Sequence, residues 1–334
     1  MTSNHLAPPA ATTPDKDRPE STPTMTKQPA APAPTSEAEV PDLAVIDSRV
    51  KRRLRRVTRS RVVRRFAADR AGQLALFTLL LLVFVAIAHS ALEPYDPLRQ
   101  DLTNIGAGPS GAHWLGTDHL GRDVLSRLIA GTAVTLWTAV LGTLVGMIGI
   151  PLGLLAGYFR GPFDAVSSRI ADGLLSIPPL LFAFGIIGFL GRGELNAALA
   201  MGIVAAPRFF RVSRTVAMTV AEEPYVEASR AAGCSTPRLL FRHVIPNASG
   251  PLLVLISQTA GIVVTVQAGL ALLGLGPEPP KPSWGGMLSD AFNQFSNEIF
   301  PMVPPAVLIV VLILCFFTLG DTIRDAFGRT KKQK

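Results

Sequence analysis

The residue patterns that nucleotide chemistry needs are incomplete in this chain. Gly106 and Gly111 have the G-x-x-x-x-G spacing of a phosphate-binding loop. The chain continues with Ala112 and His113, so the lysine that would reach the phosphates of a nucleotide is missing. We therefore expect no catalytic site and no bound cofactor in this chain, and any energy-requiring step would depend on a partner.

Metal and redox chemistry have equally little support. His113, Asp118 and His119 could ligate a metal ion, but no further ligands converge on them in the sequence. The two cysteines are Cys234, in a polar segment, and Cys315, deep in an apolar run. Because these settings differ, we expect no disulfide between them.

The elements that position these residues are membrane spans. The chain has 334 residues, of which 48% are hydrophobic and only 17% charged, and its mean hydropathy is +0.35. Soluble proteins rarely combine these values. The arginine-rich stretch 49–70 runs directly into an apolar stretch, so membrane topology explains its charge better than nucleic-acid binding does.

Six apolar stretches approach the ~20 residues needed to cross the ~30 Å hydrocarbon core. The predicted spans are 72–92, 131–158, 174–190, 195–210, 252–275 and 304–319. An even number places both ends of the chain on one side. The spans contain almost no ionisable residues, with Asp172 and Arg208 expected near the membrane edge, which argues against a secondary transporter with an ion relay.

Basic residues define the predicted organisation. They cluster before the first span, between the second and third, between the fourth and fifth, and after the sixth, which predicts that these segments are cytoplasmic. No signal peptide is apparent. The predicted parts are a disordered tail (1–48), a basic juxtamembrane segment (49–71), a six-span domain (72–325) with an external loop (93–130) and a cytoplasmic loop (211–249), and a basic tail (326–334).

Glycines follow one face of the second span. They are Gly142, Gly146, Gly149, Gly153 and Gly157, each three or four residues after the last. Such a ridge lets helix backbones approach closely, either for static packing or for sliding during transport. Pro151, within the ridge, favours a kink.

The sequence of the loop between the fourth and fifth spans predicts two short helices. The first covers about 224–232 and ends at Gly233, and the second is capped by Thr236, opens at Pro237 and ends at Pro246. The apolar face of the second helix comprises Leu239, Leu240 and Val244. A helical knob of this size on a membrane protein is typical of a docking element.

This loop resembles the E-A-A-x3-G-x9-I-x-L-P loop of ABC importer permeases. The matching residues are Glu227, Ala228, Ser229, Gly233, Ile245 and Pro246. Ser229 and His243 depart from the pattern, because they replace its second alanine and its first isoleucine. The sequence motif FRHVIPN is similar to that of the peptide and nickel branch of the family. The resemblance implies that 225–233, from Tyr225 to Gly233, forms a coupling helix that fits a groove on an ATPase subunit.

A second stretch, 113–136, resembles the external segment before the second span of dipeptide and oligopeptide permeases. Its residues singled out here are Gly116, Thr117, Asp118, Gly121, Arg122 and Asp123. Those systems pair two different permeases, and this chain is similar to the one with the shorter first external loop.

The residues of this stretch also permit a bottom-up interpretation. Asp118 is expected to cap a helix on the outer membrane interface, with Arg122 and Arg127 facing water. The apolar side of that helix would comprise Val124, Leu125, Leu128 and Ile129. Contact with a solute-binding protein, or gating, is the alternative to a structural role.

Polar residues in the fifth span are the candidates for the pathway wall. They are Gln258, Thr259, Thr265 and Gln267, which could equally bond neighbouring helices. The predicted fold class is an all-α integral membrane protein with six transmembrane helices, a cytoplasmic coupling helix and the type I importer permease fold.

The resemblance also implies the partners and the location. They are a second homologous permease, two ATPase subunits carrying ATP and Mg, an external solute-binding protein and membrane lipid, in the bacterial cytoplasmic membrane. The expected activity is import of di- or oligopeptides by alternating access. A nickel or other small-solute importer, and a secondary transporter without ATPase partners, are the alternatives.

Overall fold

Helices are the only regular elements in the part of the chain that this computed structural model describes, residues 64–277, 280–293 and 300–327, apart from one bridge between Thr117 and Asp123. The predicted tail 1–48 lies outside the described residues. So do residues 49–63 of the juxtamembrane segment and residues 328–334 of the basic tail. The all-helical fold class predicted from the sequence is confirmed.

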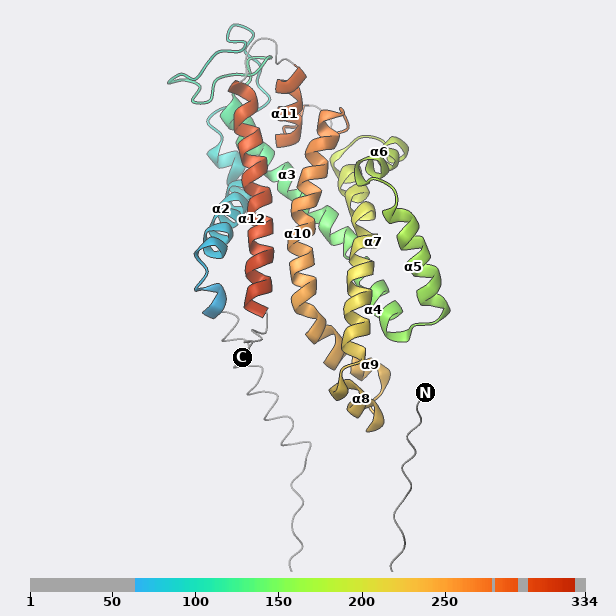
Figure 1. Ribbon diagram of the computed structural model, residues 1–334. Coiled ribbons are helices and arrows are strands. Elements are labelled where there is room, and N and C mark those ends of the chain that lie inside the picture. The colour runs from blue at the N-terminus through green and yellow to red at the C-terminus, as the bar shows by residue number, and fades with distance from the viewer. Residues whose placement is uncertain (1–63, 278–279, 294–299, 328–334) are drawn as a thin grey trace, which may run out of the picture. The chain divides into compact units, whose positions relative to one another are not determined.

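The long helices correspond to the predicted spans, with different boundaries (Figure 1). They are α2 (Arg70–Leu92), α3 (Val124–Gly146) with α4 (Gly149–Phe159), α5 (Pro162–Leu175) with α6 (Pro179–Leu190), α7 (Glu194–Ala221), α10 (Ile245–Leu272) and α12 (Val303–Phe327). Five helical runs of the described residues are long and apolar enough to cross a membrane. A sixth crossing exists if α5 and α6 are counted as one span, bent by 94°.

The third span departs most from its prediction. The expected single helix over 174–190 is wrong, because the chain breaks between α5 and α6, where Pro178 and Pro179 follow each other. Each proline disfavours helical backbone at the residue before it. Counted as one crossing, α5 and α6 begin at Pro162, in an amphipathic helix whose polar residues kept it out of the predicted span.

The second span begins earlier than its prediction. The residues before Gly131 do not form a separate interface helix, because α3 starts at Val124, where Asp123 Oδ2 accepts a hydrogen bond of 2.8 Å from the Ser126 amide. The helix is interrupted near Pro151, between the end of α3 at Gly146 and the start of α4 at Gly149. Pro151 has no amide hydrogen to bond the Met147 carbonyl, which instead accepts from the Ile150 amide at 2.9 Å.

The first and last described helices, α2 and α12, have their outer termini at the same end of the bundle. Thr322 Oγ1, near the end of α12, donates a 2.6 Å hydrogen bond to Asp69 Oδ2, just before α2. In Figure 1 the short helices α8 (Pro224–Ala231) and α9 (Thr236–Leu239) lie at this end, and α11 (Trp284–Asn293) lies at the other. We call these the α8 end and the α11 end. The arrangement agrees with an even number of crossings.

The core lies between the long helices and leaves large apolar side chains on the outside. Buried Ala139, Met201 and Val263 bring α3, α7 and α10 together. By contrast, α2 exposes a row of large side chains, Leu74, Phe77, Leu80, Phe84 and Ile87. In a helix of this length and hydropathy, an apolar outer face is what contact with lipid requires.

Candidate functional site

The segment 224–244, between α7 and α10, forms the predicted knob at the α8 end. Pro224 occupies the first turn of α8, and Gly233 has a φ of +79°, which ends the helix. The Cys234 amide donates to the Ser229 carbonyl at 3.1 Å and the Gly233 amide to the Arg230 carbonyl at 3.0 Å. The first predicted helix is confirmed to within one residue.

The second helix of the knob differs from its prediction. The capping position is Ser235 rather than Thr236, and no side chain makes the capping hydrogen bond there. Pro246 does not end the helix, since the chain continues through a π turn, Leu240–Val244, directly into α10. The π turn rearranges the backbone hydrogen bonds just before Pro246, so its missing amide hydrogen does not interrupt the helix.

Most of α8 is exposed, and one side chain anchors it. Val226 is fully buried in a cluster with Ala217 and Val220 of α7 and with the predicted apolar face of the second helix, which is confirmed. Glu227, Ala228 and Gly233 are exposed, as are Tyr225 and Pro246, while Ser229 and Ile245 are half-buried. The knob therefore offers polar and small groups outward.

Further contacts fix the direction of α8. The Arg230 guanidinium carbon lies 5.6 Å from the ring centre of Tyr158, near the end of α4. The Tyr225 and His243 rings are 6.1 Å apart, which links α8 to the π turn. Because the segment joins α7 to α10, a displacement of α8 would act on two helices that run the length of the bundle.

The segment 93–123, at the α11 end, is shaped by glycines and aspartates. A Cβ atom on Gly121, whose φ is +71°, would overlap the Asp101 carbonyl. Hydrogen bonds from Thr103 and then Asn104 hold the pKa of Asp101 down at about 2. Thr117 is buried and its Oγ1 accepts from the Ala107 amide at 2.9 Å. Gly116, with a φ of +75°, is equally confined, against the Ala107 carbonyl.

Asp118 was predicted from the sequence to cap a helix, and this prediction is wrong. It accepts hydrogen bonds from the Leu120 amide at 2.9 Å and from the Arg122 amide at 3.0 Å. Asp118 therefore closes its own loop, and Asp123 is the capping residue of α3. Asp123 also lies 2.9 Å from His113 Nδ1.

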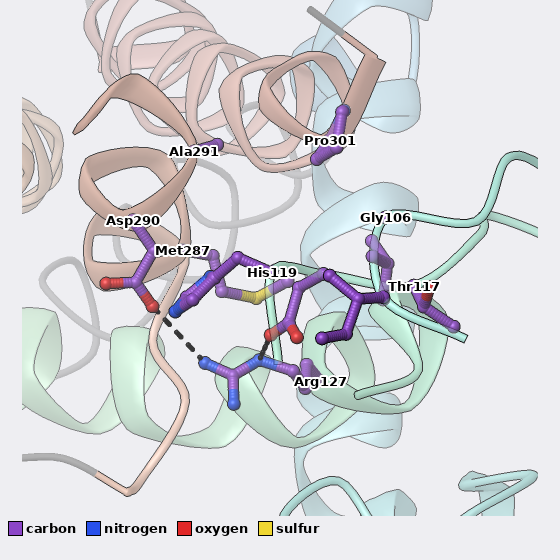
Figure 2. Close-up of a pocket in the computed structure, with 11 residues that line it drawn as sticks. Gly106, Thr117, His119, Arg127, Met287, Asp290, Ala291 and Pro301 are labelled. Carbon is purple, nitrogen blue, oxygen red and sulfur yellow. Dashed lines mark ion pairs between the residues drawn. The ribbon is translucent and has the colours of Figure 1, made fainter. Parts of the chain in front are cut away.

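The prediction that Arg122 and Arg127 face water is wrong, because they are only 5% and 3% exposed. Arg122 Nε lies 2.7 Å and Arg127 Nε 3.4 Å from Asp118 Oδ2. A second carboxylate, Asp290 of α11, lies 3.7 Å from each arginine. This four-residue cluster ties the segment 93–123 to α3 and α11, and Figure 2 shows the two ion pairs of Arg127 within it.

Beside this cluster lies a cavity of about 280 Å³ that is open on one side (Figure 2). Its lining includes Asp118, His119, Arg127, Met287 and Asp290. Arg127 Nη1 is buried and has no hydrogen-bond partner among the described residues. Within those residues, His, Cys, Asp and Glu side chains do not gather in a group of three that could hold a metal ion.

The four pathway candidates of α10 do not share one face. Thr265 is exposed, and Gln258 is half-buried next to Gly320 of α12. Thr259 and Gln267 are buried, and their Oγ1 and Oε1 atoms have no partner among the described residues. Two of the four therefore face the interior of this chain.

The predicted glycine ridge packs on α7. A Cβ atom on Gly142 would lie 3.1 Å from Met201 Cβ, and one on Gly146 3.0 Å from Ala205 Cβ. On Gly149 and Gly153 it would overlap backbone atoms of α7. The ridge thus brings the backbone of α7 into close contact with the last turn of α3 and with most of α4.

Comparison with known proteins gives consistent matches. Residues 149–332 match the family described as binding-protein-dependent transport system inner membrane component. The glutathione transport system permease protein GsiD of Pectobacterium atrosepticum is 37% identical over 265 residues, which are 79% of this chain and 88% of that protein. GsiD of Escherichia coli is 36% identical over the same length and with the same coverage.

Two solved structures share the fold. Chains of the MetNI methionine ABC transporter, in inward-facing conformations, superpose with TM-scores of 0.51 and 0.50. Each is 24% identical, and the matches cover 62% and 61% of this chain and 97% and 98% of those chains.

Proposed function

This chain belongs to the family of binding-protein-dependent transport system inner membrane components, the permeases of ABC importers, and from that premise we propose that it carries short peptides into the cell. It is a transport subunit rather than an enzyme. The proposal assigns ATP and Mg to two partner ATPases, solute delivery to an external binding protein, and the other half of the pathway to a second, homologous permease.

The single observation that carries the proposal is the exposed α8, held on a buried Val226. A helix that projects from a membrane protein and joins two long spans is suited to transmit movement from a bound partner. We assign the groove of an ATPase subunit as the partner of Tyr225, Glu227 and Ala228. ATP-driven closure of the ATPase pair would then move α7 and α10.

Charge supports the orientation. The α8 end carries the basic residues that the positive-inside rule places in the cytoplasm, including Arg160, Arg230, Arg238 and Arg242. Both ends of the chain are accordingly assigned to the cytoplasm. A cysteine introduced before Asp69 should react with a membrane-impermeant thiol reagent only in inside-out vesicles. Reaction in intact cells would contradict this topology.

Peptides are the proposed solutes because the relatives named above are glutathione permeases. Glutathione is itself a tripeptide with free carboxylates, so di- and oligopeptides and glutathione are one chemical class. A nickel chelate is the second candidate, because the FRHVIPN sequence motif is similar to that of the nickel branch of the family. Competition for uptake by unlabelled peptides, glutathione or nickel separates these candidates.

The assembly is tested by purifying the tagged chain in mild detergent and identifying every protein retained with it. The proposal expects two ATPases and a second six-span permease. If the chain is retained alone, and liposomes containing it take up peptide without ATP, the secondary-transporter interpretation replaces this one.

A further inference from the structure

Three arginines follow one another along α7 at successive turns, and within the described residues only two of them have an acidic partner. Arg214 binds both carboxylate oxygens of Asp164, with Nη2 2.7 Å from Oδ2. Arg211 pairs with Asp172, and both side chains are more than half exposed. Arg208 is exposed and forms no ion pair with any residue that the structure describes. The two acidic side chains of α5 therefore pair with Arg214 and Arg211, and α5 has no third acidic side chain for Arg208.

Arg208 lies midway along α7, which runs from Glu194 to Ala221. Its expected place near the membrane edge stays a prediction. Its neighbours Phe209 and Phe210 pack on Gly149, inside the 36-residue run Val124–Phe159. A cation within a span rarely faces lipid, since this costs at least ~2.5 kcal/mol.

The surroundings of Arg208 mark a boundary between polar and apolar surface. Toward the α8 end the exposed face of α7 continues with Arg211, Thr215 and Thr219. Toward the α11 end Ile203 lines a shallow, open apolar surface with side chains of α6, including Leu181 and Phe189. No acidic residue occurs in α6. Arg208 is thus the last charged residue on this polar face of α7, counted from the α8 end, before the apolar surface begins.

From these observations we propose that Arg208 receives the C-terminal carboxylate of a peptide as it passes through the permease. This inference rests on the proposed function and adds to it the group of the solute that is recognised and the residue that meets it. Arg211 can assist, since its partner Asp172 is exposed and an entering carboxylate can compete for the same guanidinium. The pathway wall then includes α7, and not only α10.

The test uses the purified complex in proteoliposomes, with trialanine as the probe. Arg208→Gln should lower ATP-driven trialanine uptake by about tenfold, the loss expected for one charge-assisted hydrogen bond. Hydrolysis of ATP stimulated by the loaded binding protein should persist. Arg208→Lys should keep most of the uptake. Arg169→Gln, which removes another exposed arginine from α5, is the matched control and should behave as wild type.

Unchanged uptake by Arg208→Gln would overturn the inference. So would a variant that loses uptake together with the second permease during purification, because Arg208 would then hold that subunit rather than the solute. If the wild-type complex shows no ATP-driven uptake at all, the proposed function fails instead.

A second measurement needs no transported solute. In inside-out vesicles, Arg208→Cys should react with both an anionic and a cationic membrane-impermeant methanethiosulfonate reagent, because the proposal places this face of α7 in a water-filled pathway. The wild-type chain, with Cys234 and Cys315, gives the background. Failure of both reagents to react would show that this face meets lipid or protein, and would overturn the inference.

Discussion

Gly233 ends α8 in a backbone conformation that side chains rarely adopt, with open space around it. A substitution there therefore strains the backbone without a clash. Gly233→Val should cost about 1–2 kcal/mol locally and displace α8, whereas Gly233→Asn is tolerated because asparagine visits this region. We expect the valine variant to insert normally but to co-purify with less ATPase.

Gly161 provides the matched control. It has a φ of +80° and equally open surroundings, and lies between α4 and α5 rather than in the knob. Gly161→Val should therefore keep the ATPase. Equal ATPase retention by Gly233→Val and Gly233→Asn would contradict the role assigned to this turn.

Asp118 and Asp290 make a second comparison at the residue scale. Asp118 is largely buried and contacts both arginines of the cluster, whereas Asp290 is nearly half exposed and lies farther from them. Asp118→Asn should destabilise the protein by about 3 kcal/mol, because it leaves buried guanidinium groups with little compensation. Asp290→Asn should cost less than about 1 kcal/mol.

Thermal unfolding of the two variants in detergent measures this difference. A larger loss from Asp290→Asn would mean that α11, rather than the loop around Asp118, holds the cluster together. The cluster was not predictable from the sequence, since Asp290 comes from α11 and meets Arg122 and Arg127 only after the chain has folded.

At the scale of elements, the glycine ridge fixes how α4 meets α7. A Cβ atom on Gly153 would overlap Ser213 Oγ and the Phe210 carbonyl. Gly153→Ala should therefore lower stability by about 1–3 kcal/mol, as overpacked interiors do. Gly173→Ala, in α5 with no atom within 4 Å of the new group, should be neutral or slightly stabilising.

Both variants are compared by thermal unfolding and by the amount of protein inserted in the membrane. If Gly153→Ala unfolds at the same temperature as Gly173→Ala, α4 and α7 separate easily. The ridge would then serve movement rather than static packing.

Local signals predicted some elements well and others poorly. The first helix of the knob, its glycine cap and the ridge depend on neighbouring residues, and the structure has all three. The bent α5–α6 span was missed because α5 is amphipathic and its polar residues find partners on α7, which sequence spacing does not reveal. Pro246 misled the prediction because a π turn accommodates it.

At the scale of the whole molecule, the chain is a helical membrane subunit with a solvent-exposed knob at one end and a buried charge cluster at the other. Hydropathy predicted six spans, and the described residues have five candidate spans, or six when α5 and α6 are counted as one. The burial of Arg122 and Arg127 was not predictable from the sequence, because the hydropathy of arginine favours contact with water. The partners and the direction of transport were predicted from the family resemblance alone.

The most direct measurement is ATP-dependent uptake of a labelled tripeptide by proteoliposomes that contain the co-purified complex and its loaded binding protein. The account predicts uptake only when ATP and the binding protein are both present, and its loss in the Gly233→Val complex. Uptake that proceeds equally without ATP would contradict the central claim that this permease is driven through α8 by ATPase partners.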